Sequence, residues 1–408
     1  MPQVPAGWKE TTLGEVVEFI DWDRGKNYPN WDDFKTTWFC VFLNAKNLPN
    51  RIFDFSETMF ISEEKDLILR KGKLKRWDYV MTTRWTIGNF AYYNDQVVYS
   101  NMRINSWMVI IRAYKDLINE KFLWLFFSSN IFKYYLSWFT SWSAVPQLPI
   151  KDIKQLPILL PPLPEQQAIA AVLSSFDDKI ELLRAENQTL EQMGQELFKE
   201  RFCKWKVGDV LPEGWRVGKI EDLTNYIASW GTPATKEASY YGWRINWFST
   251  KELQDSFLFS SEKTITEDAL KNSSAKEFPK DTVLMAIYAA PTVWRLWILT
   301  QSSAFNQAAV GLVAKDDIWM PFIYLLLKFH RDNFNNLANW AAQQNLNVSL
   351  VKNYEIPIPE QETLSKFDLV IKPLFNKIKQ NSEQIQTLSA TRDQLLPKLM
   401  SGEVRVEF

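Results

Sequence analysis

The sequence predicts an α/β (α+β) protein in which two similar globular domains are separated by two long antiparallel coiled-coil helices, as a pseudo-twofold internal repeat. Two observations predict this fold class. Matching motifs recur through the chain at an offset near 200 residues, and a heptad pattern of apolar residues follows each half. The 408 residues suffice for two to four domains at about 100–200 residues each.

The repeat begins at Gly7-Trp8, which matches Gly214-Trp215. One such match arises easily by chance, but six in the same order do not. The later matches are Lys46 with Lys251, Asp78-Tyr79-Val80 with Asp281-Thr282-Val283, Asn101 with Asn306, Trp142-Ser143-Ala144 with Trp340-Ala341-Ala342, and Pro164-Glu165-Gln166 with Pro359-Glu360-Gln361.

A heptad seam after each Pro-Glu-Gln motif predicts a long helix. If the helices pack antiparallel with Asn187 opposite Asn381, this one pair determines how all the remaining layers of the seam pair. A buried Asn can fix such a register, because out of register it loses its hydrogen-bond partner. Two amphipathic helices packed on their own domains are the alternative. The seams are Leu173, Phe176, Ile180, Leu183, Asn187, Leu190, Gly194 and Leu197, and Ile371, Leu374, Ile378, Asn381, Ile385, Leu388, Arg392 and Leu395.

Proline-rich segments at 156–164 and 356–359 predict the domain boundaries, because proline ends a preceding helix. We expect globular domains at 1–161 and 204–357 and helices at 162–203 and 358–408. Within the domains, β-rich runs predict strands and intervening segments predict short helices. The strands are expected at 97–99, 108–111, 283–285 and 310–313, and the helices at 62–65 and 120–127.

Composition narrows the possible functions. The net charge is −1, so no field of the whole molecule attracts nucleic acid. Two cysteines, Cys40 and Cys203, form no disulfide framework, and a single histidine, His330, leaves histidine triads and histidine metal sites without their usual parts. The start of the chain lacks a signal-peptide pattern, and its longest apolar run, 122–127, is too short to span a membrane, so we expect a cytoplasmic protein.

The doubled layout, the two Pro-Glu-Gln exits, the heptad helices and the ending Gln394-Leu395-Leu396-Pro397-Lys398-Leu399-Met400-Ser401-Gly402 resemble the DNA specificity (S) subunit of type I restriction-modification systems. The resemblance covers nearly the whole chain. It implies two target recognition domains that read a bipartite site in double-stranded DNA, spaced by the coiled coil.

The resemblance also implies the partners. These are two adenine methyltransferase (M) subunits, docked on the helices, and two restriction (R) subunits that translocate DNA. It implies no cofactor in this chain, because S-adenosylmethionine, and ATP with Mg where a nuclease partner exists, are bound by the partner subunits. The helix-spacer and docking candidates are Glu165, Gln166, Ile180, Leu183, Asn187, Leu190, Leu197, Glu360, Gln361, Ile378, Asn381, Ile385, Leu388 and Leu395.

DNA reading requires phosphate contacts for affinity and side chains at base edges for specificity. Arg reads guanine and Asn or Gln reads adenine through paired hydrogen bonds. The base-reading candidates are Arg84, Asn89, Asn101 and Arg103 in the first half, and Arg295, Asn306, Gln307, Gln343, Gln344 and Asn345 in the second. Individually, each is more often a surface or turn residue.

Phosphate contacts are expected from Lys46 and Lys251, which occupy matching positions, and from a basic cluster at 65–76. A charge run is more commonly a solvated helix face, and that alternative stays open. Residues 1–161 carry 20 Lys and Arg against 17 Asp and Glu, so the chain alone should bind DNA weakly. The cluster contains Lys65, Arg70, Lys71, Lys73, Lys75 and Arg76.

Catalysis by this chain is not expected. The sequence lacks the glycine-rich Walker loop of ATPases, the Asn/Asp-Pro-Pro-aromatic motif of amino-methyltransferases, the PD-(D/E)xK nuclease spacing, HExxH and GxSxG. A catalytic role for scattered carboxylates is the remaining enzyme hypothesis, but a solvated acidic loop explains them more simply. These carboxylates are Asp21, Asp23, Asp32 and Asp33. A coiled-coil scaffold with two interaction modules and no DNA role is the alternative function.

The sequence departs from the family pattern in its tryptophans. Glycine makes up 13 of 408 residues, about 3% against a usual 7%, whereas tryptophan reaches 19. Members of the family usually carry glycine where Trp85, Trp294 and Trp297 stand, and an indole there should strain the turn or block the DNA surface. Trp107, Trp142, Trp230, Trp243 and Trp340 raise the same question.

Overall fold

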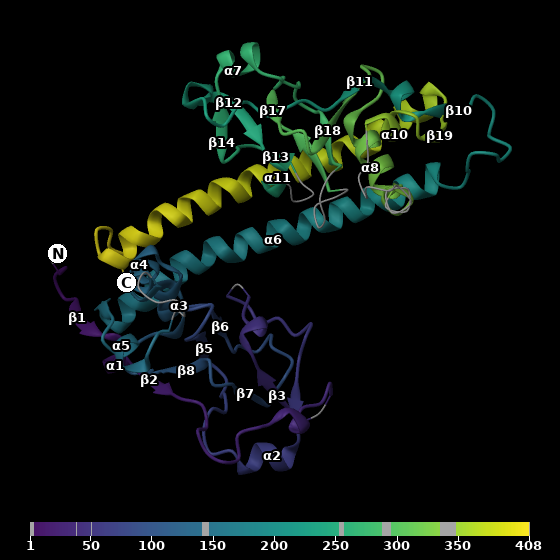
Figure 1. Cartoon of the computed structure of the whole chain (residues 1–408). Helices are drawn as coiled ribbons and strands as arrows, with labels where there is room; N and C mark the ends of the chain where they lie inside the picture. Colours follow the sequence, from purple (N-terminus) through teal and green to yellow (C-terminus); the bar gives the residue numbers. More distant parts are fainter. Residues whose placement is uncertain are drawn as a thin grey trace. The chain divides into compact units, whose positions relative to one another are not determined.

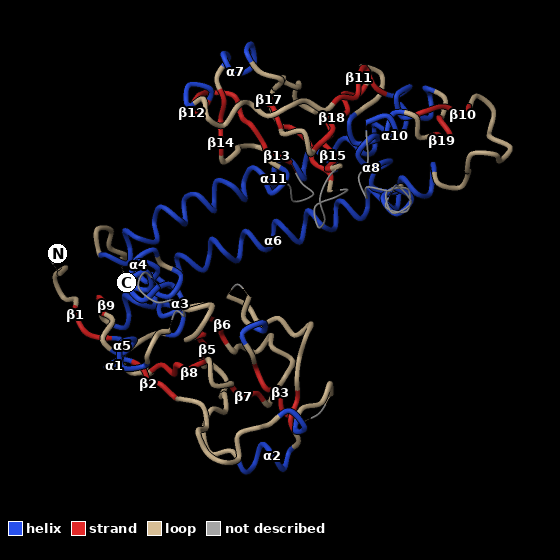
Figure 2. The backbone as a smooth tube through the Cα atoms, in the orientation of Figure 1, coloured by secondary structure: helices blue, strands red, loops and turns tan. Residues whose placement is uncertain are grey.

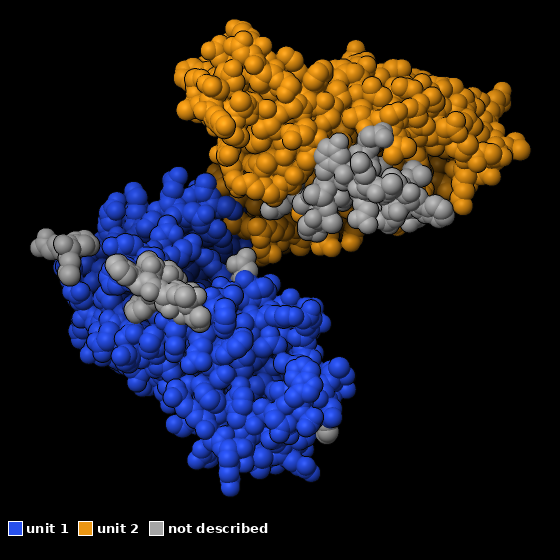
Figure 3. All heavy atoms as spheres, in the orientation of Figure 1, with its two compact units in different colours: residues 1–178, 388–408 blue, residues 179–387 orange. Residues whose placement is uncertain are grey.

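The computed structural model describes residues 4–37, 39–49, 51–140, 147–252, 257–287, 295–334 and 348–407. The chain divides into two compact units, and each is described by itself. Unit 1 contains residues 1–178 and 388–408, and unit 2 contains residues 179–387 (Figure 3).

Unit 1 is built around a four-stranded sheet in the order β2-β8-β5-β6, with a three-stranded sheet β4-β3-β7 beside it (Figure 1). The strands are β1 (Lys9–Thr12), β2 (Val17–Ile20), β3 (Cys40–Leu43), β4 (Phe60–Ile61), β5 (Tyr79–Thr82), β6 (Phe90–Tyr92), β7 (Met102–Ile104), β8 (Met108–Ala113) and β9 (Pro157–Leu160). The short helices are α1 (Leu13–Val16), α2 (Glu63–Ile68), α3 (Glu120–Ser128), α4 (Asn130–Thr140) and α5 (Ile150–Lys154).

Unit 2 contains a five-stranded sheet β11-β18-β15-β16-β13 and a three-stranded sheet β14-β12-β17. The strands are β10 (Arg216–Lys219), β11 (Thr224–Ala228), β12 (Tyr241–Phe248), β13 (Phe257–Leu258), β14 (Lys263–Ile265), β15 (Val283–Ala286), β16 (Leu296–Leu299), β17 (Ser303–Phe305), β18 (Ala309–Ala314) and β19 (Glu355–Ile358). The short helices are α7 (Glu267–Asn272), α8 (Met320–Phe329) and α10 (Val348–Lys352).

The two units share one strand order, which confirms the predicted internal repeat. The series β2-β8-β5-β6 corresponds to β11-β18-β15-β16, and β4-β3-β7 corresponds to β14-β12-β17. The central strand of each small sheet has one antiparallel and one parallel neighbour in both units. The same chain pattern therefore folds twice.

Most predicted strands are present, with one exception. The runs at 108–111, 283–285 and 310–313 lie in β8, β15 and β18. The strand predicted at 97–99 is wrong, because these residues follow a turn in which the Val97 N–H donates to the Asn94 carbonyl at 3.2 Å. Val98 is 82% exposed, so its β-branched side chain has no sheet to pack against.

The proline-rich exits have a structural role that their composition did not predict. Pro157–Leu160 forms β9, which pairs antiparallel with β1 at the start of the same half. Glu355–Ile358 forms β19, which pairs in the same way with β10. Each exit thus closes its half by joining the end of the domain to its beginning.

Two helices of 40 and 41 residues, α6 (Leu163–Phe202) and α11 (Gln361–Ser401), follow the exits (Figure 2). Pro164 stands in the first turn of α6, where its missing N–H removes no helical hydrogen bond. Each helix contributes residues to both units, because the boundaries fall after Asp178 and after Thr387. Within the described residues, no helix is long and apolar enough to cross a membrane.

Candidate DNA-contacting residues and helix pair

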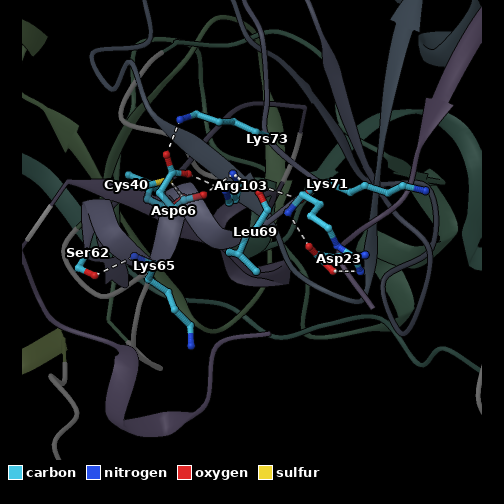
Figure 4. A network of polar contacts seen from close by, with 11 residues as sticks. Asp23, Cys40, Ser62, Lys65, Asp66, Leu69, Lys71, Lys73 and Arg103 are labelled. Atoms are coloured by element: carbon cyan, nitrogen blue, oxygen red, sulfur yellow. Dashed lines mark hydrogen bonds and ion pairs between the residues drawn. The ribbon is translucent and has the colours of Figure 1, made fainter. Parts of the chain in front are cut away.

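Arg103, predicted to read a base, lies inside unit 1 instead. Its side chain is 6% exposed and its Nε donates to Asp66 Oδ1 at 2.5 Å (Figure 4). Its two terminal nitrogens donate to the backbone carbonyls of Lys71 at 2.7 Å, Asp66 at 2.6 Å and Leu69 at 2.9 Å. The prediction of a base contact is wrong for this residue, because its guanidinium N–H groups already donate to α2 and to the loop after it. These hydrogen bonds hold α2 and that loop against β7.

Asp66 is the centre of this polar network. The carboxylate is 2% exposed and also accepts a hydrogen bond from Lys73. Burial alone would raise the pKa of Asp66, but the hydrogen bonds from Lys73 and Arg103 outweigh burial and lower it. Cys40 lies beside the network, and burial raises the pKa of its thiol to about 12, so this thiol stays protonated.

The basic cluster at 65–76 is partly neutralised within the fold. Lys65 pairs with Asp33 at 2.8 Å, and its hydrogen bond lowers the pKa of that carboxyl. Arg70 lies 3.5 Å from Asp23, and Lys73 pairs with Asp66 as described above. Arg76 stacks over Tyr93 with 4.2 Å to the ring centre and donates to the Asn94 carbonyl.

Lys71 and Lys75 are exposed, and within the described ranges neither forms an ion pair. They are the members of the cluster that remain available for phosphate. The continuous phosphate rail expected from the sequence is therefore reduced to these two lysines, with Arg70, whose side chain is 76% exposed, beside them.

Lys46 and Lys251 do occupy equivalent positions, as predicted from the repeat. Each stands in a 3-10 turn that follows the central strand of a small sheet, β3 or β12. Lys46 pairs with Glu57 at 2.5 Å, and Lys251 pairs with Glu262, a carboxylate at the same spacing of eleven residues. Both lysines are more than 60% exposed, so these pairs are open to competition from an external anion.

The other base-reading candidates differ in their surroundings. Asn89 is committed internally, since its Nδ2 donates to the Leu48 carbonyl at 2.9 Å. Gln307 is exposed on the surface of unit 2, although its Oε1 accepts a hydrogen bond from Thr232 at 2.5 Å. Arg84 and Arg295 are half-buried, and Gln343, Gln344 and Asn345 lie outside the described residues.

The structure corrects the match of Asn101 with Asn306. Asn105 and Asn306 make the same turn, because each side-chain oxygen accepts from the N–H two residues later, at 2.9 and 3.2 Å. Both stand three residues before the start of a six-residue strand, β8 or β18, and this spacing is the sequence signal that was missed. Asn101 uses its carbonyl to accept from Val41 at 3.0 Å.

The helix pair is antiparallel within unit 2. Asn187 Nδ2 donates to Ser382 Oγ at 3.2 Å, and Asn381 Nδ2 donates to Glu186 Oε2 at 3.0 Å. Further along, Gly194 of α6 faces Ile371 of α11, so the α11 contact moves back as α6 advances. The register predicted from Asn187 and Asn381 is correct within about one residue.

The two asparagines do not hydrogen-bond to each other as predicted. Each donates to the residue next to the other asparagine, Ser382 or Glu186, and among the residues described Asn187 Oδ1 is buried without a hydrogen bond. Seam residues nevertheless pack as expected: Ile180 and Leu183 are 2% exposed, Ile378 is 8% exposed, and Leu190 and Leu197 pack on the core of unit 2. Ile385 and Leu388 are half-buried.

In unit 1 the two helices meet again. Arg392 of α11 pairs with Asp177 of α6 at 2.6 Å, and Leu395 packs on the unit 1 core that contains Leu173 and Ile169. From Asn187 with Ser382 to Asp177 with Arg392, the position on α6 falls by ten residues while the position on α11 rises by ten. The pairing is therefore antiparallel in this part as well.

The Pro-Glu-Gln motif anchors each long helix to its domain. Glu165 and Gln166 are fully buried, so they serve contacts inside unit 1 and are not an open docking face for a partner. Gln166 accepts from the Asn119 N–H at 2.8 Å and donates to the Leu117 carbonyl at 3.0 Å, just before α3. Gln361 makes the corresponding bond to the Asp317 carbonyl at 2.7 Å, before α8.

Glu360 of the second motif accepts a hydrogen bond from the Thr363 hydroxyl at 3.1 Å, at the start of α11. Among the residues that the structure covers, no group of three or more His, Cys, Asp or Glu side chains is placed to hold a metal ion. The described residues offer exposed lysines, such as Lys46 and Lys251, and helices that pair within each unit.

Comparisons with known proteins agree with this arrangement. Residues 5–192 and 212–389 match the family described as Type I restriction modification DNA specificity domain. The MjaIX specificity subunit of Methanocaldococcus jannaschii is 31% identical over 311 residues, covering 72% of this chain and 71% of that protein. The HindI specificity subunit of Haemophilus influenzae is 23% identical over 471 residues, covering 97% of this chain and 99% of that protein.

A crystal structure of a type I restriction-modification S subunit from M. genitalium has the same fold. Its TM-score is 0.59 at 14% identity, covering 98% of both chains. The chain belongs to the type I restriction-modification DNA specificity family. It is a non-catalytic specificity subunit, and subunits of this family act on DNA together with methyltransferase and restriction subunits.

Proposed function

We propose that this chain reads a bipartite site in double-stranded DNA for a type I restriction-modification complex, with one half-site for each repeated domain. The observation that carries the proposal is the duplication itself. The same strand order, the same asparagine turn and the same lysine with its carboxylate occur in both units. One chain thus carries two equivalent sets of side chains for two stretches of DNA.

The exposed lysines supply the phosphate contacts. Lys46 and Lys251 can exchange their exposed carboxylate partners for DNA phosphate, because a surface ion pair contributes little on its own. Gln307 and the residues of the strand-connecting loops supply the base contacts.

The partners carry the chemistry. Two methyltransferase subunits dock on the helix pair and methylate adenine with S-adenosylmethionine after flipping the base from the duplex. Two restriction subunits complete the complex and use ATP and Mg. Exposed apolar side chains on the helices, among them Leu182, Met193 and Leu369, are the docking candidates, since the seam residues themselves are largely turned inward.

Co-expression with the methyltransferase encoded beside the gene, followed by genome-wide mapping of methylated adenine, tests the proposal. We expect methylation at one motif made of two specified parts with an unspecified spacer between them. Replacing residues 204–357 by the matching segment of a relative should change one part of the motif and leave the other unchanged. A stable complex that neither binds DNA nor methylates adenine would support the scaffold alternative instead.

The helix pair should determine the spacer. Inserting seven residues into each helix keeps the seam on the same face, because two turns of helix take about seven residues. We expect the two specified parts of the motif to be unchanged and the unspecified spacer to be longer. An unchanged spacer in an active complex would contradict this role.

A further inference from the structure

Two tryptophans have a backbone conformation that suits glycine. Among the described residues, only four that are not glycine have φ in the left-handed region: Arg51, Trp77, Trp85 and Asp281. For a bulky side chain this conformation is a true outlier, whereas aspartate adopts it several times more often than most residues. Two of the four positions are therefore occupied by one of the least suitable residue types.

The internal repeat shows that the fold imposes this conformation at Trp77. Trp77, and not Asp78 as the motif match indicated, occupies the same turn as Asp281, before the central strands β5 and β15. The Trp77 N–H donates to the Tyr93 carbonyl at 2.9 Å, and the Asp281 N–H donates to the Leu299 carbonyl at 2.7 Å. Their φ angles are +75° and +64°. The turn is thus left-handed in both halves whatever the side chain.

Trp85 lies in a tighter turn. The Thr86 N–H donates to the Arg84 carbonyl at 2.8 Å, across Trp85 with φ of +61°. A three-residue turn of this sign is rare and strained for residues with a Cβ, and glycine adopts it without that cost. The indole gains little in return, because Trp85 is 59% exposed.

Two further tryptophans stand where the other half has alanine. The carbonyls of Trp107 and Ala308 accept equivalent hydrogen bonds, from Thr83 at 2.7 Å and from Ile287 at 2.8 Å.

Trp297 is opposite Leu284 on β15, and Ala91 is opposite Val80 on β5, the equivalent pair. Trp297 is fully buried, and within the described part of the chain its Nε1–H has no hydrogen-bond partner. A buried indole normally finds one.

Trp8 and Trp247 stand where the other half also has an aromatic residue, although the buried Nε1 of Trp247, like that of Trp297, has no hydrogen-bond partner among the described residues. Trp8 is buried and its Nε1 donates to Glu165 at 3.0 Å, and the repeat matches it with another tryptophan, Trp215. Trp247 is matched by the aromatic Phe42, on the corresponding central strand. By comparison with the other half, the positions of Trp8 and Trp247 fit an aromatic side chain, whereas those of Trp77, Trp85, Trp107 and Trp297 fit a small residue or one that tolerates the left-handed conformation.

We propose that Trp77, Trp85, Trp107 and Trp297 are glycines in the protein made by its own cells, which read as glycine a codon that other decoding systems read as tryptophan. The standard code has one tryptophan codon, UGG, and variant codes add UGA. The gene should therefore carry UGA at these four positions and UGG at Trp8 and Trp215. Glycine at these four positions would change the counts from 13 glycines and 19 tryptophans to 17 and 15, which reduces the deficit of one and the excess of the other.

The consequence for DNA reading rests on the proposed function. Trp85 and Trp107 lie near each other, with ring centres 6.4 Å apart, at the loop end of the unit 1 sheet. Glycine at both positions would free the backbone of these turns for close approach to DNA.

Sequencing the gene and analysing peptides of the protein purified from its own cells test the proposal. We expect UGA codons at Trp77 and Trp85, and peptides lighter at each site by the mass difference between a tryptophan and a glycine residue. The peptide containing Trp8 should retain its tryptophan. UGG at Trp77 and Trp85, or tryptophan in the native peptides at these sites, would overturn the proposal.

Thermal unfolding of recombinant variants gives an independent test. Trp77→Gly and Trp85→Gly, combined in a chain made with tryptophan at both sites, should raise the unfolding midpoint, whereas Trp8→Gly should lower it. A lower midpoint for the combined variant would contradict the proposal. These tests need neither DNA nor a methyltransferase, so their failure is distinguishable from a failure of the proposed function.

Discussion

Arg405 binds Glu165 although 240 residues separate them in the sequence. Its NH2 donates to Glu165 Oε2 at 2.8 Å and its NH1 donates to the Ala6 carbonyl at 3.0 Å. Glu165 is completely buried and also accepts from Trp8. One carboxylate at the beginning of α6 therefore joins both ends of the chain in unit 1.

Arg405→Ala should lower the stability of unit 1, because it leaves the buried Glu165 charge without its cation. We expect a lower midpoint of thermal unfolding, measured by circular dichroism, with partial recovery in Arg405→Lys, which keeps the charge and loses the paired hydrogen bonds. Equal midpoints for the alanine variant and the unaltered chain would show that this contact is not stabilising.

Arg103→Ala should lower the free energy of unfolding of unit 1 without changing the DNA motif that the complex methylates. Removing one partner of a buried ion pair costs about 3–5 kcal/mol, and Arg103 and Asp66 are 6% and 2% exposed. The measurement is the free energy of unfolding in denaturant, with exposed Lys71→Ala as the control. If Arg103→Ala kept its full stability but methylated a less specific DNA motif, Arg103 would be a base-reading residue after all.

Asn187→Leu should stabilise the helix pair. The substitution removes a buried Oδ1 that has no hydrogen bond to any described residue, and such burial costs about 1–3 kcal/mol. In return it loses the bond to Ser382. Denaturant unfolding compares it with Gln188→Leu at an exposed neighbouring position. Destabilisation by Asn187→Leu would mean that the asparagine contributes more than its single observed hydrogen bond.

Lys46→Ala and Lys251→Ala should weaken DNA binding by the complex with its methyltransferase. Each lost phosphate contact should reduce the slope of log affinity against log salt by about 0.9, equally for all DNA sequences. Titrations at several salt concentrations measure this slope. Glu57→Gln and Glu262→Gln remove the carboxylate partners of the same lysines and should strengthen DNA binding. A change in the methylated DNA motif of the lysine variants would exclude a role in phosphate contact.

His330 should make unit 2 less stable in mild acid. Burial lowers its pKa from 6.5 to about 4, so the folded state holds the neutral ring while the unfolded state takes up a proton. The contribution of His330 to stability is therefore complete above pH 6.5 and is lost as the pH falls toward 4. His330→Gln should remove this part of the pH dependence.

His330 is the only histidine in the sequence, so its imidazole resonances in an NMR titration report this pKa without ambiguity. Its Nδ1 lies 3.1 Å from the Tyr354 hydroxyl and 3.2 Å from Asn333 Nδ2. A titration midpoint near 6.5 in the folded protein would contradict the burial effect.

Periodic and repeated features were predictable from the sequence. The heptad seam, with Ile180 and Ile378 among its members, predicted two long helices and their antiparallel register, because a helix repeats its contacts every three or four residues. The matched motifs predicted two similar domains. The lysines at 46 and 251 followed from the same comparison and are equivalent in the structure.

Individual polar residues were less predictable, because their role depends on which partner the chain brings to them. Arg103 has a residue type suited to guanine, yet Asp66, 37 residues away, makes it a buried structural ion. The asparagine equivalent to Asn306 is Asn105 and not Asn101, which only the shared turn revealed.

The sequence by itself determined the two-domain repeat, the helix pair and the family, since local periodicity and spaced motifs encode them. Only the tertiary structure decided which charges stay exposed. Lys71 remains available while Lys73, two residues later, is paired with Asp66. The reason is physical: burial and ion pairing arise from contacts between distant segments, and no pattern of neighbouring residues records them.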